Sequence, residues 1–342
     1  MSERLEDIAQ AMMTRGQGIL AADESTGTIK KRFDQINVES TETNRRDYRE
    51  MLFRAEPAMT DNISGVILFD ETLRQSSDDG TRLADIIKAA GAVPGIKVDG
   101  GAKPLAGCPG EMVTEGLDGL RERLAEYYDL GARFAKWRSV ISIAEGIPTG
   151  TCINANSHGL ARYAALCQEA GIVPIVEPEV QMDGPDASHD IDLCHEVTEA
   201  TLKTVFADLY DAGVLLEGIV LKPNMVIAGN NAAVQASAEE VAEKTVNCLK
   251  NCVPAAVPGI AFLSGGQSEE QASENLSLMN AMGNLPWALT FSYGRALQQA
   301  ALKAWLGKAE NVPAAQAAFA HRARMNGLAA IGEWSASLEQ AA

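Results

Sequence analysis

Short apolar runs of four to six residues alternate with longer polar segments along the whole chain. Runs of this length, rich in Val, Ile, Leu and Ala, are typical of buried strands. The segments between them show helical periodicity, as at residues 120–130, 157–168 and 238–250, and a glycine often follows where a helix should end. We predict eight strands, at residues 18–22, 64–69, 95–98, 132–137, 172–176, 218–221, 259–263 and 288–291.

Eight strands that alternate with helices predict an α/β fold with a parallel sheet. Their number and spacing suit a closed (β/α)8 TIM barrel, which needs about 250 residues before additions. The alternative is an open doubly wound sheet. The chain has no G-x-G-x-x-G motif after its first strand, and eight regular units favour closure.

No low-complexity linker divides the sequence, so we predict a single barrel domain over residues 1–342. An apolar fraction of 46% is enough to fill one large core. Residues 313–342 are alanine-rich and helix-prone. We expect them to form a C-terminal helical segment and a short tail, packed outside the barrel.

The formal net charge of −17 argues against a nucleic-acid partner, which normally requires a basic face. No apolar run approaches the roughly 20 residues of a membrane helix, so we expect no membrane partner. The polar, acidic N-terminus lacks the apolar stretch of a signal peptide, and we expect a cytoplasmic protein. The six scattered cysteines are interpreted as small buried hydrophobes, in preference to a zinc site or disulfides.

Every predicted strand ends in charged residues or in a Gly/Ser-rich turn. Chemistry in a barrel takes place at the carboxyl ends of the strands. One charged residue at such an end is ordinarily solvated, but polar ends on all eight strands indicate a site. In chain order the ends are Asp23-Glu24-Ser25, Asp70-Glu71, Lys97 with Asp99, Lys136 with Arg138, Glu177 with Glu179, Lys222, Ser264-Gly265-Gly266, and Ser292-Tyr293-Gly294-Arg295.

The last two strand ends are candidate phosphate sites. Barrels often bind phosphate there, through backbone N–H groups of glycine-rich turns and of short helix N-termini. Arg295 adds a cation that can bind phosphate through two parallel hydrogen bonds. One Gly-Gly turn alone is a weak signal. Two such turns, one of them with an arginine, predict a phosphate site in an otherwise acidic protein.

Lys222 closes an apolar run, and Pro223 stops the strand behind it. Such a lysine either has its ammonium in water or is a nucleophile held in a pocket. A lysine amine is nucleophilic only when neutral, and lowering its pKa by about three units takes on the order of 4 kcal/mol, which burial and a second cation can supply. Lys136 could be that cation, while Glu177 and Asp23 could move protons. This set indicates Schiff-base chemistry on a carbonyl substrate, which needs no metal or other cofactor.

Seven motifs, in chain order, resemble those of class I fructose-bisphosphate aldolases: LAADEST, GIKVD, AKWR, VPIVEPE, LLEGIVLKPNM, FLSGGQSEE and PWALTFSYGRALQ. The resemblance extends from about residue 9 to about residue 334, which is nearly the whole chain. It implies a (β/α)8 lyase of glycolysis and gluconeogenesis, commonly a homotetramer, that works without a metal. The implied reaction is the reversible cleavage of fructose 1,6-bisphosphate to dihydroxyacetone phosphate and glyceraldehyde 3-phosphate through a lysine imine.

The motifs also imply a role for each catalytic residue. Lys222 resembles the lysine that forms the imine. Glu177, with Glu179 beside it, resembles the acid/base that dehydrates the carbinolamine. Asp23 resembles the base on the C4 hydroxyl during cleavage, and Lys136 resembles the lysine that stabilises charge next to the imine.

Two groups of residues are expected to bind the two phosphates. Arg32 resembles a mobile arginine on the phosphate side of the site. The C6 phosphate is expected to meet Ser25, Lys97 and Arg138. The C1 phosphate is expected to rest on Ser264, Gly265, Gly266, Gly294 and Arg295, with Ser292 nearby.

One feature departs from the family. Many members end in a flexible tail whose terminal tyrosine assists proton exchange at the carbanion, whereas the last aromatic residue of this sequence is Trp334. We expect another acid, or water, to take over that step, or the step to be slow.

Three rival functions remain at this point. A deoxyribose-phosphate aldolase or a transaldolase would also use a lysine, but two phosphate sites favour a bisphosphate. A metal-dependent aldolase is disfavoured because none of the four histidines lies at a predicted strand end. A non-catalytic scaffold that kept an aldolase surface would be expected to lose the polar mouth, and every matched charge is present.

Overall fold

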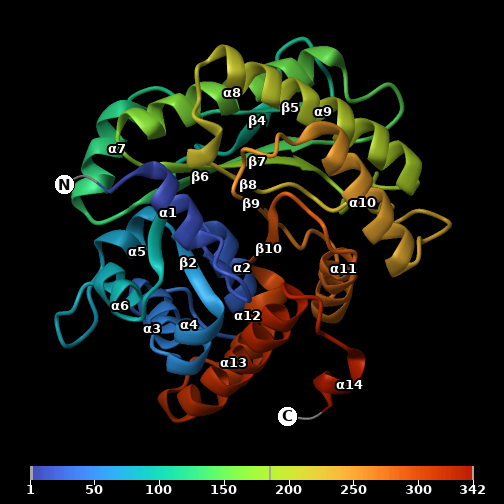
Figure 1. Cartoon of the computed structure of the whole chain (residues 1–342). Helices are drawn as coiled ribbons and strands as arrows, with labels where there is room; N and C mark the ends of the chain where they lie inside the picture. The colour runs from blue at the N-terminus through green and yellow to red at the C-terminus, as the bar shows by residue number, and fades with distance from the viewer. Residues whose placement is uncertain (1–2, 185, 341–342) are drawn as a thin grey trace.

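The computed structural model describes residues 3–184 and 186–340. Its eight parallel strands close into a barrel, in the order β1-β10-β9-β8-β7-β6-β3-β2 (Figure 1). The predicted (β/α)8 barrel is therefore confirmed, and an open doubly wound sheet is excluded. The barrel strands are β1 (Gly18–Ala22), β2 (Ile63–Leu68), β3 (Val93–Lys97), β6 (Phe134–Ile141), β7 (Val173–Val180), β8 (Val220–Leu221), β9 (Gly259–Phe262) and β10 (Ala288–Tyr293).

Helices surround the barrel, and several begin where a polar side chain can cap them. Ser25, Thr149 and Ser268 each accept a hydrogen bond from the backbone N–H three residues further on. The α-helices are α1 (Leu5–Met12), α2 (Thr26–Asp34), α3 (Glu42–Phe53), α4 (Glu56–Asn62), α5 (Asp70–Arg74), α6 (Leu83–Ala89), α7 (Leu120–Asp129), α8 (Gly150–Glu169), α9 (Ile191–Asp211), α10 (Ala238–Cys252), α11 (Glu269–Ala281), α12 (Arg295–Trp305), α13 (Val312–Ala329) and α14 (Ala336–Glu339).

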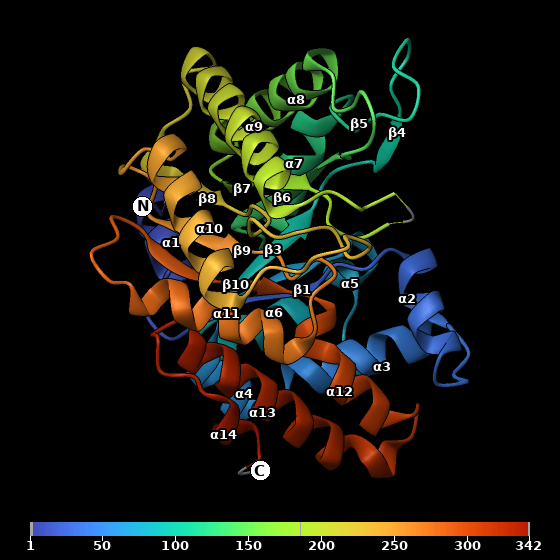
Figure 2. The same cartoon turned by 90° about the vertical axis from the view of Figure 1, so that its right-hand side faces the viewer.

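Apolar side chains form two layers. The larger lies between the strands and the surrounding helices. The smaller fills the barrel interior, where Ile8 and Met12 of α1 pack with Ile19, Phe134 and Val173 of the strands. Figure 2 shows α1 at one end of the barrel and α2 at the other. Because α1 closes the end where the strands begin, the polar site is left at the opposite end.

The strand bounds differ from the prediction in ways that the backbone explains. β6 and β7 run on to Ile141 and Val180 because they pair with each other along their whole length. β8 is reduced to two residues, since residues 216–218 form a 3-10 turn just before it. A short antiparallel pair, β4 (Ala102–Pro104) with β5 (Met112–Thr114), was missed, because strands of three residues are too short to show an apolar run or an alternation.

The C-terminal segment forms helix α13, which packs against α12, α4 and α11 (Figures 1 and 2). The short helix α14 follows it, and Ala341 and Ala342 lie outside the described residues. The single-domain assignment stays a prediction. None of the described helices has the length and apolar character to cross a membrane.

Candidate active site

A polar cavity of about 310 Å³ opens at the carboxyl ends of the barrel strands. All but two of the predicted site residues line it. Apart from Arg32 of α2, they come from seven of the eight strands or the turns after them. Gly266 and Arg295 lie next to this lining without being part of it. The predicted residues that line the cavity are Asp23, Ser25, Arg32, Lys97, Lys136, Arg138, Glu177, Glu179, Lys222, Ser264, Gly265, Ser292 and Gly294.

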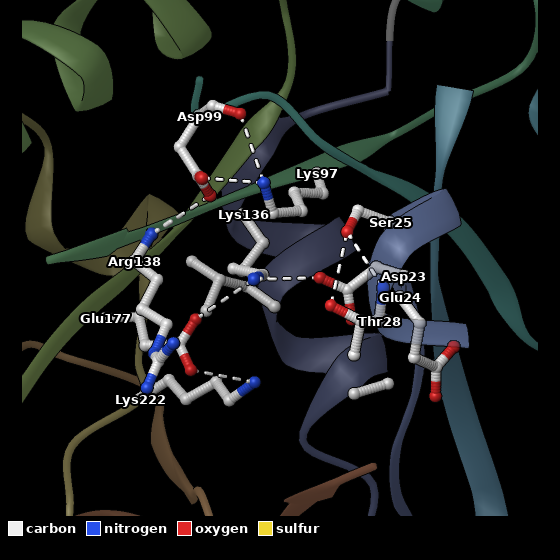
Figure 3. Close-up of polar contacts among 12 residues, drawn as sticks. Asp23, Glu24, Ser25, Thr28, Lys97, Asp99, Lys136, Arg138, Glu177 and Lys222 are labelled. Carbon is white, nitrogen blue, oxygen red and sulfur yellow. Dashed lines mark hydrogen bonds and ion pairs between the residues drawn. The ribbon is translucent and has the colours of Figure 1, made fainter. Parts of the chain in front are cut away.

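Two lysines and two carboxylates form a chain of contacts at the centre of the cavity (Figure 3). Lys136 Nζ lies 2.8 Å from Asp23 Oδ2 and 3.4 Å from Glu177 Oε2. Lys222 Nζ lies 3.1 Å from the other oxygen of Glu177, Oε1. One carboxylate therefore contacts both lysines. Lys136, Glu177 and Lys222 are each at most 4% exposed, so these ion pairs are shielded from water.

The opposite charges at this centre stabilise one another in their ionised forms. Burial alone would raise the pKa of Asp23, but Lys136, Lys222 and Lys97 outweigh it and lower that pKa to about 2. Burial would likewise lower the pKa of Lys136, yet Asp23, Glu177 and Asp99 raise it above its usual value. At neutral pH Asp23 is therefore a carboxylate and Lys136 an ammonium.

A second group of charges lies on the side of β3 and β6. Lys97 Nζ donates to Asp99 Oδ1 at 2.6 Å, and the other oxygen of Asp99 accepts from the backbone N–H of Arg138 at 3.4 Å (Figure 3). Arg138 Nε also donates to Glu179. Burial would lower the pKa of Arg138, but the carboxylate of Glu179 raises it. Lys97 and Arg138 thus present two cations to the cavity.

The turn after β9 forms the opposite wall. Gly265 adopts φ +51°, a left-handed conformation that favours glycine. Its carbonyl accepts from Arg295 Nη2 at 2.9 Å, and the carbonyl of Ser264 accepts from the backbone and side chain of Gln267, both at 3.1 Å. The buried hydroxyl of Ser292 has no hydrogen-bond partner among the residues that the structure describes. Polar groups are thus available on this wall for an anion.

Arg32 connects α2 to the turn after β1. Its Nη1 donates to Glu24 Oε1 at 2.5 Å, and the same oxygen accepts from Gln298 Nε2 at 2.9 Å. Arg32 Nη2 is 3.5 Å from the position that a Cβ on Gly294 would occupy. Arg32 therefore lies beside the turn after β10.

Four polar residues of the cavity were not among the predicted site residues. Glu24 and Thr28 line it, and Asp99 orients Lys97. Asp183 also lines it. The sequence analysis names Glu24 and Asp99 at strand ends but assigns neither of them a role. Asp183 continues the two-residue alternation of Glu177 and Glu179 beyond β7, whereas Thr28 lies one helical turn after its partner Ser25 and carries no signal of its own.

No group of three or more His, Cys, Asp or Glu side chains in the described part of the chain could hold a metal ion. The six cysteines are free thiols, four of them buried, in keeping with their interpretation as small hydrophobes.

A buried lysine against a carboxylate in the mouth of a barrel is the arrangement that a lyase working through a lysine imine requires. Residues 4–342 match the family model of "Fructose-bisphosphate aldolase class-I", and the chain belongs to that family. The predicted family and the predicted reaction, the aldol cleavage of fructose 1,6-bisphosphate, are therefore confirmed. Class I aldolases use a lysine imine and no metal, so a metal-dependent aldolase is excluded.

Known proteins support this placement along nearly the whole chain. A probable class 1 fructose-bisphosphate aldolase of Xanthomonas axonopodis pv. citri is 61% identical over 97% of this chain and 98% of its own length. A cytosolic fructose-bisphosphate aldolase of Arabidopsis thaliana is 55% identical over 93% of this chain and 80% of its own. A structure of the Plasmodium falciparum aldolase, solved with TRAP and a small-molecule inhibitor, superposes with a TM-score of 0.93 at 50% identity, covering 97% of this chain and 95% of that one.

Proposed function

We propose that Lys222 is the residue that forms the imine with the substrate ketone. The contact between Lys222 Nζ and Glu177 Oε1, at 3.1 Å between two side chains that are at most 4% exposed, is the observation that carries this proposal. Glu177 can take the proton that Lys222 must lose to become a nucleophile. The neutral amine attacks C2, and one of its protons passes to the former carbonyl oxygen. The protonated carboxyl of Glu177 then gives its proton to this hydroxyl, which leaves as water.

Cleavage then proceeds between C3 and C4. The carboxylate of Asp23 accepts the C4 hydroxyl proton as the bond breaks, and the bonding electrons move into the iminium to give an enamine. Because its low pKa makes Asp23 a weak base, we propose that this proton transfer is concerted with bond breaking. Lys136, held as an ammonium between Asp23 and Glu177, stabilises both carboxylates and the charge that develops next to the imine.

The two phosphates are proposed to lie at opposite walls. The C6 phosphate meets Lys97, Arg138 and Ser25. The C1 phosphate rests on the turns after β9 and β10, at Ser264, Gly265, Gly266, Ser292, Gly294 and Arg295. Because Arg32 lies against Gly294, we place it on the C1 side. Two separated anion sites suit a ketose bisphosphate better than a monophosphate, and this supports fructose 1,6-bisphosphate as the preferred substrate.

We further propose a cytoplasmic homotetramer. The Arabidopsis relatives named as cytosolic enzymes support the location, and the resemblance to the family supports the assembly. Gel filtration with light scattering would test the assembly, and a mass of one chain would contradict it.

Reductive trapping tests the role of Lys222. Borohydride added with dihydroxyacetone phosphate should reduce the iminium and inactivate the enzyme, and a tryptic map should place the added mass on Lys222. Lys136→Ala should still form the adduct on Lys222. An adduct on Lys136 in the unchanged enzyme would overturn the assignment.

A further inference from the structure

We infer that Met182 is a positioning residue for the C1 phosphate, together with Asn230, and that both act through the glycine turn after β9. The inference rests on the proposed phosphate role of Ser264, Gly265 and Gly266. Neither Met182 nor Asn230 is among the described residues that line the cavity. They support the turn from behind.

The side chains of Met182 and Asn230 pack closely against the two glycines of the turn. A Cβ on Gly265 would lie 2.5 Å from Met182 Sδ and 2.8 Å from its Cε, far inside van der Waals contact. A Cβ on Gly266 would overlap the side-chain amide of Asn230 in the same way. Met182 is 1% exposed. Its thioether therefore occupies the volume next to Gly265 and excludes water from it.

The two supporting residues are fixed to each other by their backbones. Asn230 N–H donates to the Met182 carbonyl at 2.8 Å, and Gly229 N–H donates to the His189 carbonyl at 2.9 Å. The loop after β7 and the loop after β8 are therefore bonded side by side. These loops follow Glu177 and Lys222. The two residues that support the turn are therefore attached to the two strands that carry the proposed imine chemistry.

This arrangement sets the direction of the turn's donors. The carbonyls of Ser264 and Gly265 are already bonded, to Gln267 and Arg295 respectively. Within residues 3–184 and 186–340, the backbone N–H groups of Gly265 and Gly266 donate no hydrogen bond. Met182 and Asn230 prevent the turn from moving outward, so these N–H groups stay aimed at one place. A displacement of about 1 Å in such a contact can cost a large factor in binding.

The test compares two ketones that form the same imine, of which only one has a phosphate. We expect Met182→Ala to raise the half-saturating concentration of dihydroxyacetone phosphate in borohydride trapping about tenfold. Trapping with unphosphorylated dihydroxyacetone should change less than twofold. Met182→Leu, which refills most of the volume, should restore phosphate-dependent binding. Met59→Ala, which truncates a buried methionine on α4, should leave both ketones unaffected.

Each contrary result has a definite meaning. Equal losses on both ketones for Met182→Ala would show a general structural role and overturn the inference, as would no loss on either. Ser264→Ala distinguishes a failure of the positioning role of Met182 from a failure of the proposed C1 phosphate site. If Ser264→Ala weakens dihydroxyacetone phosphate and Met182→Ala does not, the positioning role fails alone. If Ser264→Ala also binds dihydroxyacetone phosphate normally, the proposed C1 phosphate site is wrong.

Discussion

Glu177 organises the site at the scale of single residues, because it contacts both lysines at once. The sequence predicted Lys222, Lys136, Glu177 and Asp23 as one group, since each stands at the end of a predicted strand. It could not predict which carboxylate faces which amine. In the structure Glu177 contacts Lys222, while Lys136 lies between Glu177 and Asp23. These pairings support a separate task for each residue.

The lowered pKa of Asp23 predicts an acid-dependent contribution to stability. Its folded pKa of about 2 lies below the usual value of 3.8. Its ionised form is therefore favoured in the folded state, and the stability it adds is present above about pH 4 and is lost as the pH falls toward 2. Between pH 6 and pH 3 the free energy of unfolding should therefore fall by about 1 kcal/mol more in the unchanged protein than in Asp23→Asn.

Urea denaturation of Asp23→Asn and the unchanged protein at the two pH values measures this difference. Glu310→Gln, which changes an exposed carboxylate that makes no ion pair within the described residues, provides the matched control and should not alter it. An unaltered pH dependence in Asp23→Asn would contradict the lowered pKa.

The two phosphate walls make different predictions for two arginines. Arg295→Ala should raise KM for both fructose 1,6-bisphosphate and fructose 1-phosphate, because the C1 phosphate is common to them. Arg138→Met should raise KM for the bisphosphate alone, by about tenfold if one charged contact of roughly 1.5 kcal/mol is lost. Steady-state kinetics on the two sugars measures the contrast.

Arg138→Met also leaves Glu179 without its ion-pair partner, and a buried unpaired charge disturbs a site by itself. The Arg138→Met/Glu179→Gln double variant removes that charge and should keep the same contrast between sugars. If either variant impairs fructose 1-phosphate as strongly as the bisphosphate, Arg138 does not bind the C6 phosphate.

At the scale of elements, the pairing of β6 with β7 explains contacts that no residue pattern contains. Arg138 is the register partner of Glu177, yet its side chain reaches Glu179, two residues further along. Lys136 pairs with Ile175 and likewise reaches Glu177. Both contacts are displaced by the same two residues, as expected when barrel strands tilt and their side chains slant across to the next strand. Alternation along a strand predicted which side chains face inward, but this offset depends on the closed barrel.

Helix α14 is held to α13 mainly through one carboxylate. Glu339 accepts from Arg322 Nη1 at 2.6 and 2.7 Å and from Trp334 Nε1 at 2.8 Å, and it lies 3.0 Å from His321 Nε2. Burial would raise the pKa of Glu339, but these bonds lower it. The docking is therefore stable above the usual glutamate pKa and weakens as the pH falls through the lowered value.

We expect Glu339→Gln to release α14, because a neutral amide leaves the buried Arg322 without a counter-charge. Hydrogen exchange should show faster exchange in residues 333–340 and little change in the barrel strands. Glu333→Gln, at an exposed position six residues earlier, should leave hydrogen exchange in these residues unchanged. Unaltered protection of α14 in Glu339→Gln would mean that apolar packing holds the helix instead.

Across the whole molecule, the barrel is apolar and tightly packed where the strands begin and charged where they end. The charged end could be predicted, because Lys, Arg, Asp and Glu at strand ends are visible in a sequence. The closed end could not, because its close contacts depend on glycines that face aromatic rings on neighbouring strands. The ring of Phe134 on β6 lies over Gly95 on β3 and against Gly65 on β2. In the layer between strands and helices, the ring of Phe291 lies over Gly18 in the same way. The absence of side chains at these glycines makes room for the rings, a complementarity that appears only when the barrel closes.

This packing predicts a large, specific cost for adding one methyl group. A Cβ on Gly95 would overlap the Phe134 ring, which is fully buried in a close-packed interior. We expect Gly95→Ala to lower the free energy of unfolding by about 3 kcal/mol, measured by urea denaturation. Gly159→Ala, in the interior of α8 with nothing within 4 Å of the added atom, should leave stability unchanged or raise it by about 0.5–1 kcal/mol.

A second substitution, Phe134→Leu, tests whether the ring causes the loss in Gly95→Ala. The double variant should be less destabilised than the sum of the two single effects, by about 1 kcal/mol or more. Strict additivity of the two substitutions would show that Gly95 is needed for its backbone and not for the ring that lies over it.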